Sequence, residues 1–282
     1  MKNLIRINEL VMFVGLAKFL HGLDFDDENF NQDKVGFTVA DIACDHGYIG
    51  YELIKNKIAD KVIFSDISIK SLEKAMNLIK NSEYLQFSEF KIGDGVEVLD
   101  GNIFASVIAG IGGREIVKIL KSDHVELSKF YILQTSQDDV FLRMKLKELG
   151  FYILCDKCML DNKHVYHTFL VSTIQIQKND KYLDELVLNY FCKQYKQEML
   201  NLNQDKLEKY FNFVSDFYGK NNMILNNSLN LDCINFEIER FTRIMMKIET
   251  EKISDYSDSM KEYLKEIKQR LDALDKIKLS IL

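Results

Sequence analysis

Short apolar runs alternate with helix-like segments over residues 35–180, and this alternation restricts the possible folds more than any other feature of the chain. The runs are rich in β-branched and aromatic residues, as is typical of strands buried in a parallel sheet. They lie at 37–42, 61–65, 90–92, 106–109 and 130–133. Helical patterns separate most of them, at 50–58, 69–80, 113–121 and 138–149. This order predicts an α/β fold with a doubly wound, mostly parallel sheet and helices on both faces.

Two further strand-like runs complete a predicted seven-stranded sheet. Residues 151–160 and 165–173 flank a turn at 161–163, which predicts a terminal antiparallel hairpin. Such a hairpin is usual in class I methyltransferases and foreign to most NAD-binding dehydrogenase domains. Before the sheet, residues 1–34 form a helical lead-in that ends in an acidic loop at 24–29. We therefore expect a first domain over 1–178.

The remaining residues, 179–282, have a different character, with one glycine and no strand signal. A heptad seam predicts a long helix that pairs with an earlier helix over 181–218, around an asparagine-rich turn at 221–230. The seam consists of Met260, Leu264, Ile267, Leu271, Leu274, Lys278 and Ile281. We expect a C-terminal antiparallel coiled-coil domain in a monomer, with dimerisation through this tail as the alternative.

Composition restricts the cellular setting and the partners. No apolar run is long enough to span a membrane, and the first residues do not resemble a secretory signal, so we expect a cytoplasmic protein. The five cysteines then indicate reduced thiols, and the C-x-x-C pair Cys155 and Cys158 lacks two further ligands at metal-site spacing, so no metal is expected. The net charge of −6 implies that any nucleic acid binds to a local basic patch.

The candidate chemistry lies in the loops that follow the strands, because ligands of open parallel sheets bind at the strands' carboxyl ends. Residues 39–48 read V-A-D-I-A-C-D-H-G-Y, in which Ala43 and Gly47 allow a ligand to approach the backbone closely. Asp41 and Asp45 repel phosphate, and the three glycines of a dinucleotide fingerprint are absent. The loop therefore favours a phosphate-free, positively charged ligand such as S-adenosylmethionine.

Three further loops follow the next strands. Asp66, beside Ile67 at the end of the second strand, is placed to bind ribose hydroxyls. The Gly-Asp-Gly at 93–95 can bring Asp94 to an adenine amino group, and the glycine-rich loop at 109–113 can lie over a reacting methyl group. The predicted cofactor-binding residues are Asp41, Ala43, Gly47, Asp66, Ile67, Gly93, Asp94, Gly95, Ala109, Gly110, Gly112 and Gly113.

These motifs resemble those of the bacterial tRNA (adenine-N1)-methyltransferases that modify adenine 22 near the D-loop. That family has D-I-G-x-D-H-A/G-Y-L in the first loop, where this chain has D-I-A-C-D-H-G-Y-I at 41–49. The family's G-D-G-L-E-V and I-A-G-M-G-G correspond to G-D-G-V-E-V at 93–98 and I-A-G-I-G-G at 108–113. The resemblance covers about residues 1–175 and implies a Rossmann-like class I fold, S-adenosylmethionine as cofactor, tRNA as partner and a coiled-coil tail.

The chain also departs from that family. Its Q-P-N after the fifth strand is Gln134-Thr-Ser136 here, and its first-loop glycine is Ala43. Two alternatives therefore stay open: a methyltransferase for another RNA base or for protein, and an RNA-binding scaffold that has lost catalysis. A dehydrogenase is disfavoured by the missing glycine fingerprint.

If the resemblance holds, the reaction restricts the catalytic candidates. Adenine N1 carries a lone pair, so methylation needs no prior deprotonation, but the product is cationic and a carboxylate near the base is useful. Asp45 is the candidate carboxylate, His46 and Tyr48 the orienting or stacking groups, and Gln134 a reader of the adenine edge. The candidate RNA-phosphate contacts are Arg6, Arg114, Lys118, Lys121, Lys145 and Lys163.

Overall fold

A computed structural model describes residues 4–22, 36–174, 186–187, 190 and 228–249, together with helical residues at 264–265, 267–272, 274–275 and 278. The chain divides into two compact units. One contains residues 1–155 and 167–190, and the other contains 156–166 and 191–282. The predicted acidic loop at 24–29 and residues 191–218 of the helix predicted over 181–218 lie outside the described residues. Among the described residues, no helix is long and apolar enough to cross a membrane.

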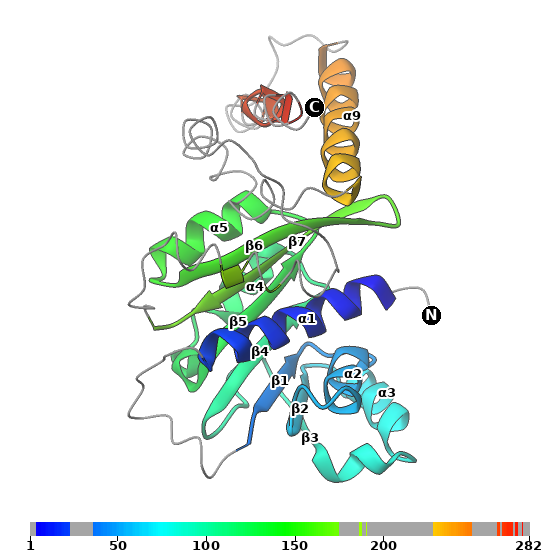
Figure 1. The fold of residues 1–282 in the computed structure, drawn as a ribbon, viewed down its shortest axis with the longest axis vertical. Helices are drawn as coiled ribbons and strands as arrows, with labels where there is room; N and C mark the ends of the chain where they lie inside the picture. The colour runs from blue at the N-terminus through cyan, green and yellow to red at the C-terminus, as the bar shows by residue number, and fades with distance from the viewer. Residues whose placement is uncertain are drawn as a thin grey trace. The chain divides into compact units, whose positions relative to one another are not determined.

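Seven strands form one mixed sheet, with the order β3-β2-β1-β4-β5-β7-β6 (Figure 1). The first five strands pair in parallel, and β7 runs antiparallel to β5, as the sequence predicts. The hairpin turn contains Asn162 and Lys163, both with positive φ. The strands are β1 (Thr38–Ile42), β2 (Lys61–Asp66), β3 (Ser88–Ile92), β4 (Ile103–Ala109), β5 (Ser128–Thr135), β6 (Tyr152–Asp161) and β7 (His164–Ser172).

Five helices of the first unit flank this sheet, and two 3-10 turns precede β3 and β5. The helix predicted at 50–58 is shorter than expected, because it ends at Lys55, where the Asn56 amide group donates to the carbonyl of Glu52. The elements are α1 (Leu4–His21), α2 (Tyr48–Lys55), α3 (Ile69–Ile79), η1 (Glu83–Phe87), α4 (Gly113–Ile119), η2 (Asp123–Leu127) and α5 (Asp139–Glu148).

The alternation of side chains along each strand gives the sheet two apolar faces. On one face, Ile63 of β2 belongs to a buried cluster that includes Ile116 of α4 and Leu142 of α5. On the other face, the β2 neighbour Phe64 lies against α2. Both faces are thus covered, and burial of each Leu, Ile or Phe side chain contributes about 1.5–3 kcal/mol to folding. This packing holds the carboxyl ends of the strands, and hence their loops, in place.

The second unit contains a helix that the sequence patterns did not predict. Helix α9 (Ser228–Glu249) begins inside the predicted turn region at 221–230, so that prediction is wrong at residues 228–230. The buried residues Ile234 and Phe241, with half-buried Ile238 between them, have the spacing of an amphipathic helix and were the missed signal. In the same unit, Cys158 and Val165 from the hairpin tip form a small apolar cluster with Leu160 and Phe236.

Part of the predicted heptad seam can be located in this second unit. Ile267 and Leu274 are buried, and both lie in helical residues. The guanidinium group of Arg270 lies 5.4 Å from the centre of the Phe241 ring, so this segment contacts α9. Of the predicted partner helix over 181–218, the structure describes residues 186, 187 and 190, which are helical, and the antiparallel coiled coil stays a prediction.

Candidate functional site

The loop between β1 and α2 has an unusual backbone. Ala43, Asp45 and Gly47 all have positive φ values, of 54°, 42° and 67°. Non-glycine residues rarely adopt this conformation, so the loop needs support from its surroundings. At Gly47 a Cβ atom would also lie 2.7 Å from the Cβ of Ala75 on α3, which leaves no room for a side chain. Gly47, which was predicted to allow a ligand to approach, thus lets this loop pack against α3.

Asp41, at the end of β1, anchors the start of α2. Its Oδ2 accepts a hydrogen bond of 2.9 Å from the backbone N–H of Gly50, and the residue is 1% exposed. Burial raises the pKa of the Asp41 carboxyl to about 7, although the Gly50 hydrogen bond lowers it, and the nearby charge of Asp66 raises it further. The residue therefore titrates near neutral pH beside the predicted cofactor loop.

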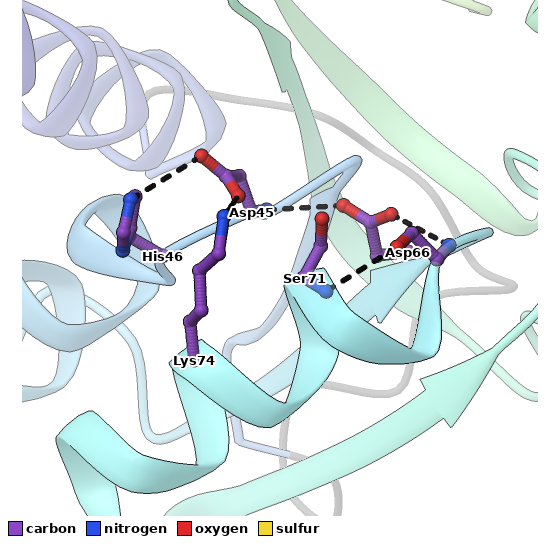
Figure 2. Close-up of polar contacts among 6 residues, drawn as sticks. Asp45, His46, Asp66, Ser71 and Lys74 are labelled. Carbon is purple, nitrogen blue, oxygen red and sulfur yellow. Dashed lines mark hydrogen bonds and ion pairs between the residues drawn. The ribbon is translucent and has the colours of Figure 1, made fainter.

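Asp66, at the end of β2, connects three of the predicted loops (Figure 2). Its Oδ2 accepts from the backbone N–H of Asp45 at 3.1 Å, and its Oδ1 accepts from that of Ser68 at 2.8 Å. Its backbone carbonyl accepts from the N–H of Gly93, which opens the Gly-Asp-Gly loop. Ser68 in turn caps α3 through its hydroxyl, which accepts from the N–H of Ser71. One residue, through its carboxylate and its backbone carbonyl, thus joins the first, second and third loops.

Asp45, His46 and Tyr48 form a partly exposed polar and aromatic surface above this carboxylate. The Asp45 carboxylate lies 2.6 Å from the Lys74 ammonium group of α3 and 3.6 Å from Nε2 of His46. The hydrogen bond from Lys74 lowers the pKa of the Asp45 carboxyl, so the group is ionised at neutral pH. The His46 and Tyr48 rings are stacked, with their centres 5.3 Å apart. The structure therefore brings together three of the four predicted catalytic residues.

Apolar side chains are exposed at the neighbouring strand ends. Ile67, after β2, is 69% exposed, and Ile92, at the end of β3, is 55% exposed. The two positions are adjacent, because Asp66 and Ile92 pair in the register of β2 and β3. Asp94 follows in the exposed Gly-Asp-Gly loop. Ile92 was missed from the sequence, although its place directly before Gly93 is the signal that could have identified it.

The glycine-rich loop after β4 leaves open space at its tip. Added Cβ atoms at Gly110 or Gly112 would meet no described atom within 4 Å, and Gly110 has a φ of 82°. At Gly113, by contrast, a Cβ atom would lie 2.6 Å from the carbonyl oxygen of Asp138. Only glycine at 113 lets this loop approach the loop after β5, where the Gly113 N–H donates to the carbonyl of Gln137.

Thr135 shapes that loop after β5. Its hydroxyl donates to the Gln137 carbonyl at 2.6 Å and accepts from the Gln137 N–H at 3.1 Å. These two bonds form a side-chain turn where the resembling family has proline. The departure at 135 therefore still gives an ordered loop. Thr135 was not among the predicted site residues.

Gln134 lies below this surface. It is fully buried, and its amide nitrogen donates to the hydroxyl of Thr168 on β7 at 2.9 Å. Within the described residues, its Oε1 accepts no hydrogen bond. Gln134 thus differs from the other three predicted catalytic residues, which are exposed.

Two of the predicted RNA contacts meet beside this site. The Arg114 guanidinium group lies 4.5 Å from the centre of the Phe141 ring, and the Lys145 ammonium group lies 5.9 Å from the same centre. Arg114 also pairs with Asp138 at 3.3 Å, and Lys118 pairs with Glu115. Of the remaining three, Lys121 is exposed, Arg6 is half-buried on α1, and Lys163 lies in the hairpin turn of the second unit.

The described residues contain no group of three or more His, Cys, Asp or Glu side chains that could hold a metal ion. Cys155 and Cys158 are buried on β6. Their odd spacing directs the two side chains to opposite faces of the strand, so they cannot chelate one ion together.

Comparison with known proteins identifies a family and several proteins that are similar to this chain. Residues 31–169 match the family described as "Methyltransferase domain". The chain is 30% identical over 145 residues to the "Putative tRNA methyltransferase" of Mycoplasma pneumoniae. This match covers 51% of this chain and 67% of that protein.

Solved structures share the fold. The structure of M. capricolum TrmK in complex with S-adenosyl-homocysteine has a TM-score of 0.59 and 20% identity, and the match covers 87% of this chain and 92% of that one. The B. subtilis m1A22 tRNA methyltransferase TrmK has a TM-score of 0.56 and 19% identity, over 86% and 92% of the two chains.

Proposed function

Since the chain belongs to the methyltransferase family of the Mycoplasma pneumoniae protein, we propose that it is an S-adenosylmethionine-dependent tRNA (adenine-N1)-methyltransferase that acts on adenine 22. The observation that carries this proposal is the convergence of three strand-end loops on Asp66. The proposed target agrees with the activity for which the B. subtilis protein of the same fold is named. It also agrees with the motifs at 41–49, 93–98 and 108–113.

The residues at these strand ends fit S-adenosylmethionine. A cluster of two carboxylates, Asp41 and Asp66, suits a cationic ligand without phosphates, and exposed Ile67 and Ile92 suit the faces of an adenine ring. Ala43, Gly47, Gly93, Asp94, Gly95, Ala109, Gly110, Gly112 and Gly113 complete the proposed cofactor site. When bound, this cofactor supplies an electrophilic methyl group.

The chain's own contribution to catalysis is orientation and charge. Asp45 holds a carboxylate that complements the positive charge developing on the adenine, and no base is needed, because N1 already carries a lone pair. The stacked rings of His46 and Tyr48 offer a surface for a nucleotide displaced from its helical stack. Gln134 contributes its buried Oε1 as an acceptor for the base edge, which requires the side chains that cover it to move.

The tRNA is proposed to contact both parts of the chain. Arg114 and Lys145, which meet at Phe141, are proposed phosphate contacts, and Lys118 on α4 and Lys121 just beyond the end of that helix extend them. We assign Arg6 and Lys163 to the same role. The proposed domains are a methyltransferase domain at 1–178 and a helical coiled-coil domain at 179–282 that binds tRNA, in a cytoplasmic monomer.

The test is incubation with labelled S-adenosylmethionine and unmodified tRNA, followed by nucleoside analysis. The expected product is N1-methyladenosine, and a tRNA with position 22 changed should accept no label. Label on another base or on protein would refute the proposed target while preserving the chemistry. A chain that binds tRNA but not the cofactor would instead be an RNA-binding scaffold.

A further inference from the structure

Helix α3 holds the Asp45 loop at two points (Figure 2). Near the start of the helix, Ser68 donates its N–H to Asp66, and the other oxygen of that carboxylate accepts the N–H of Asp45. In the second turn, the Lys74 ammonium group donates to Oδ1 of Asp45 at 2.6 Å. The first point fixes the backbone of Asp45, and the second fixes its side chain. Together they close a ring of contacts from α3 to the loop and back.

The contact with Lys74 is made by a residue that has an unusual backbone conformation. With a φ of 42°, the residue lies in a region that aspartate visits only with local support. Its side chain is 54% exposed, and that of Lys74 is 45% exposed, so the ion pair is screened by water. Exposed pairs of this kind contribute little to stability. The effect of Lys74 is therefore mainly on where the carboxylate lies.

The surroundings of the Asp45 carboxylate leave Lys74 as its main cationic neighbour among the described residues. From α3, Lys74 and the Ser71 hydroxyl face it; from its own loop, His46 faces it at 3.6 Å. Asp66 at the end of β2 and Asp41 at the end of β1 are the anionic groups of the same site. Without Lys74, His46 would be the one charged group among the described residues that still lowers the pKa of Asp45.

We propose that Lys74 is a positioning residue, whose ammonium group fixes the Asp45 carboxylate, and the loop that carries it, beside the base to be methylated. This inference rests on the proposed function. A carboxylate stabilises a developing cation only from the right side and distance, because preorganised charges act where the new charge forms. Nothing in the sequence motifs points to Lys74, since it lies on α3, outside all four motif loops.

The experiment compares Lys74→Met with Lys74→Arg, which keeps the charge, and with Lys70→Met, which removes an exposed lysine from the same helix. We expect Lys74→Met to lower kcat about tenfold or more, and to change the Kd of S-adenosylmethionine by less than about threefold. Lys74→Arg should restore kcat to within about threefold of the wild type. Lys70→Met should match the wild type.

A pH profile separates positioning from a purely structural effect. Because Lys74 lowers the pKa of Asp45, its removal should move the acid limb of the kcat/KM profile to higher pH. An unchanged kcat together with an unchanged acid limb would overturn the inference.

A wild-type chain that methylates no tRNA would refute the proposed function instead. In that case, the role of Lys74 can still be tested by an NMR titration that follows the chemical shift of the Asp45 carboxyl carbon against pH. We expect the pKa of Asp45 to be higher in Lys74→Met than in the wild type. The same titration curve in both proteins would overturn the inference.

Discussion

At the scale of single residues, Asp66 has the most connections within the site. Its carboxylate already accepts two backbone hydrogen bonds, so a bound ribose would add to contacts that exist without it. We expect Asp66→Ala to weaken S-adenosylmethionine binding about tenfold or more, the scale of one lost hydrogen bond to a charged group. Calorimetry measures this directly, with Asp100→Ala, an exposed carboxylate, as the control. Unchanged affinity in Asp66→Ala would refute the proposal that Asp66 binds the ribose hydroxyls of the cofactor.

Gly50 determines how closely α2 lies on the sheet. A Cβ atom there would lie 2.3 Å from Cε1 of Phe64, a fully buried ring that cannot swing away. We expect Gly50→Ala to lower the free energy of unfolding by about 2 kcal/mol, although alanine favours helices. Urea denaturation measures the change.

The control for Gly50 is Gly112→Ala, where a Cβ atom meets nothing within 4 Å and φ is an ordinary −72°. That substitution should change the free energy of unfolding by less than about 1 kcal/mol. Equal effects of the two substitutions would contradict the packing argument.

The raised pKa of Asp41 predicts a pH dependence of stability. Between its ordinary pKa of 3.8 and its folded pKa of about 7, the folded chain binds this proton and the unfolded chain does not. The contribution of Asp41 to stability therefore falls as pH rises through this window, by about 1.4 kcal/mol per unit of pKa shift at most, and is constant above it.

The test is Asp41→Asn, which keeps a side-chain oxygen for the Gly50 N–H and loses the charge. We expect this variant to gain stability relative to the wild type between pH 4 and pH 7, as measured by urea denaturation at each pH. A constant difference across this range would show that Asp41 does not titrate there.

The residues of the site were predictable to different degrees. Asp41, Asp45 and Asp66 were predicted from their places at or just after the carboxyl ends of buried strands, and the structure places all three there. Lys74 could not be predicted, because its contact with Asp45 depends on how α3 lies over the loop. The spacing of residues within a short segment does not show how a helix is oriented toward a distant loop. For Gln134 the pattern gave the position at the end of β5 but not its full burial.

At the scale of elements, the loop after β5 shows how a departure from a motif can be compensated. Thr135 makes two hydrogen bonds to Gln137, whose carbonyl also accepts from Gly113 in the loop after β4. We expect Thr135→Val to lower the free energy of unfolding by about 1–2 kcal/mol and to lower kcat/KM at least threefold. The reason is that the hydrogen bonds of the Thr135 hydroxyl, which position the two loops, are lost.

The control for Thr135 is Thr38→Val, whose hydroxyl makes only a 3.5 Å contact with the carbonyl of Gly36. It should cost less than about 1 kcal/mol in urea denaturation. Unchanged kcat/KM in Thr135→Val would mean that the loops hold their shape without this hydroxyl.

The elements of the sheet were predictable, because buried parallel strands and amphipathic helices have different apolar periods. Helix α9 was missed for two reasons. The chain has no proline and few glycines to mark helix ends, and the asparagine-rich residues before it suggest a turn. The sheet order, with β7 between β5 and β6, follows only from the pairing of strands far apart in the sequence.

At the scale of the whole molecule, the C-terminal part can be tested by removal. Tyr190 belongs to the first unit, where its hydroxyl donates to the carbonyl of Met12, so the cut should follow residue 190. We expect the chain without 191–282 to keep its affinity for S-adenosylmethionine and to bind tRNA at least tenfold more weakly. Calorimetry and gel shifts measure the two affinities. Equal tRNA affinity would refute a recognition role for the tail.

The contacts of α1 have a consequence for how the chain is made. The helix leaves the ribosome before most of the residues it packs against, since its buried residues, including Phe13 and Leu16, lie in a unit whose strands β4 and β5 and Tyr190 are made later. At 5–20 residues per second, the delay between Phe13 and Tyr190 is roughly 10–35 s. Helix α2, which also contacts α1, is made early in that interval, but the apolar face of α1 is fully covered only once β4, β5 and Tyr190 have been made. Slower translation between α1 and Tyr190 would lengthen this partial exposure, and chaperones that bind apolar segments would find a target in α1.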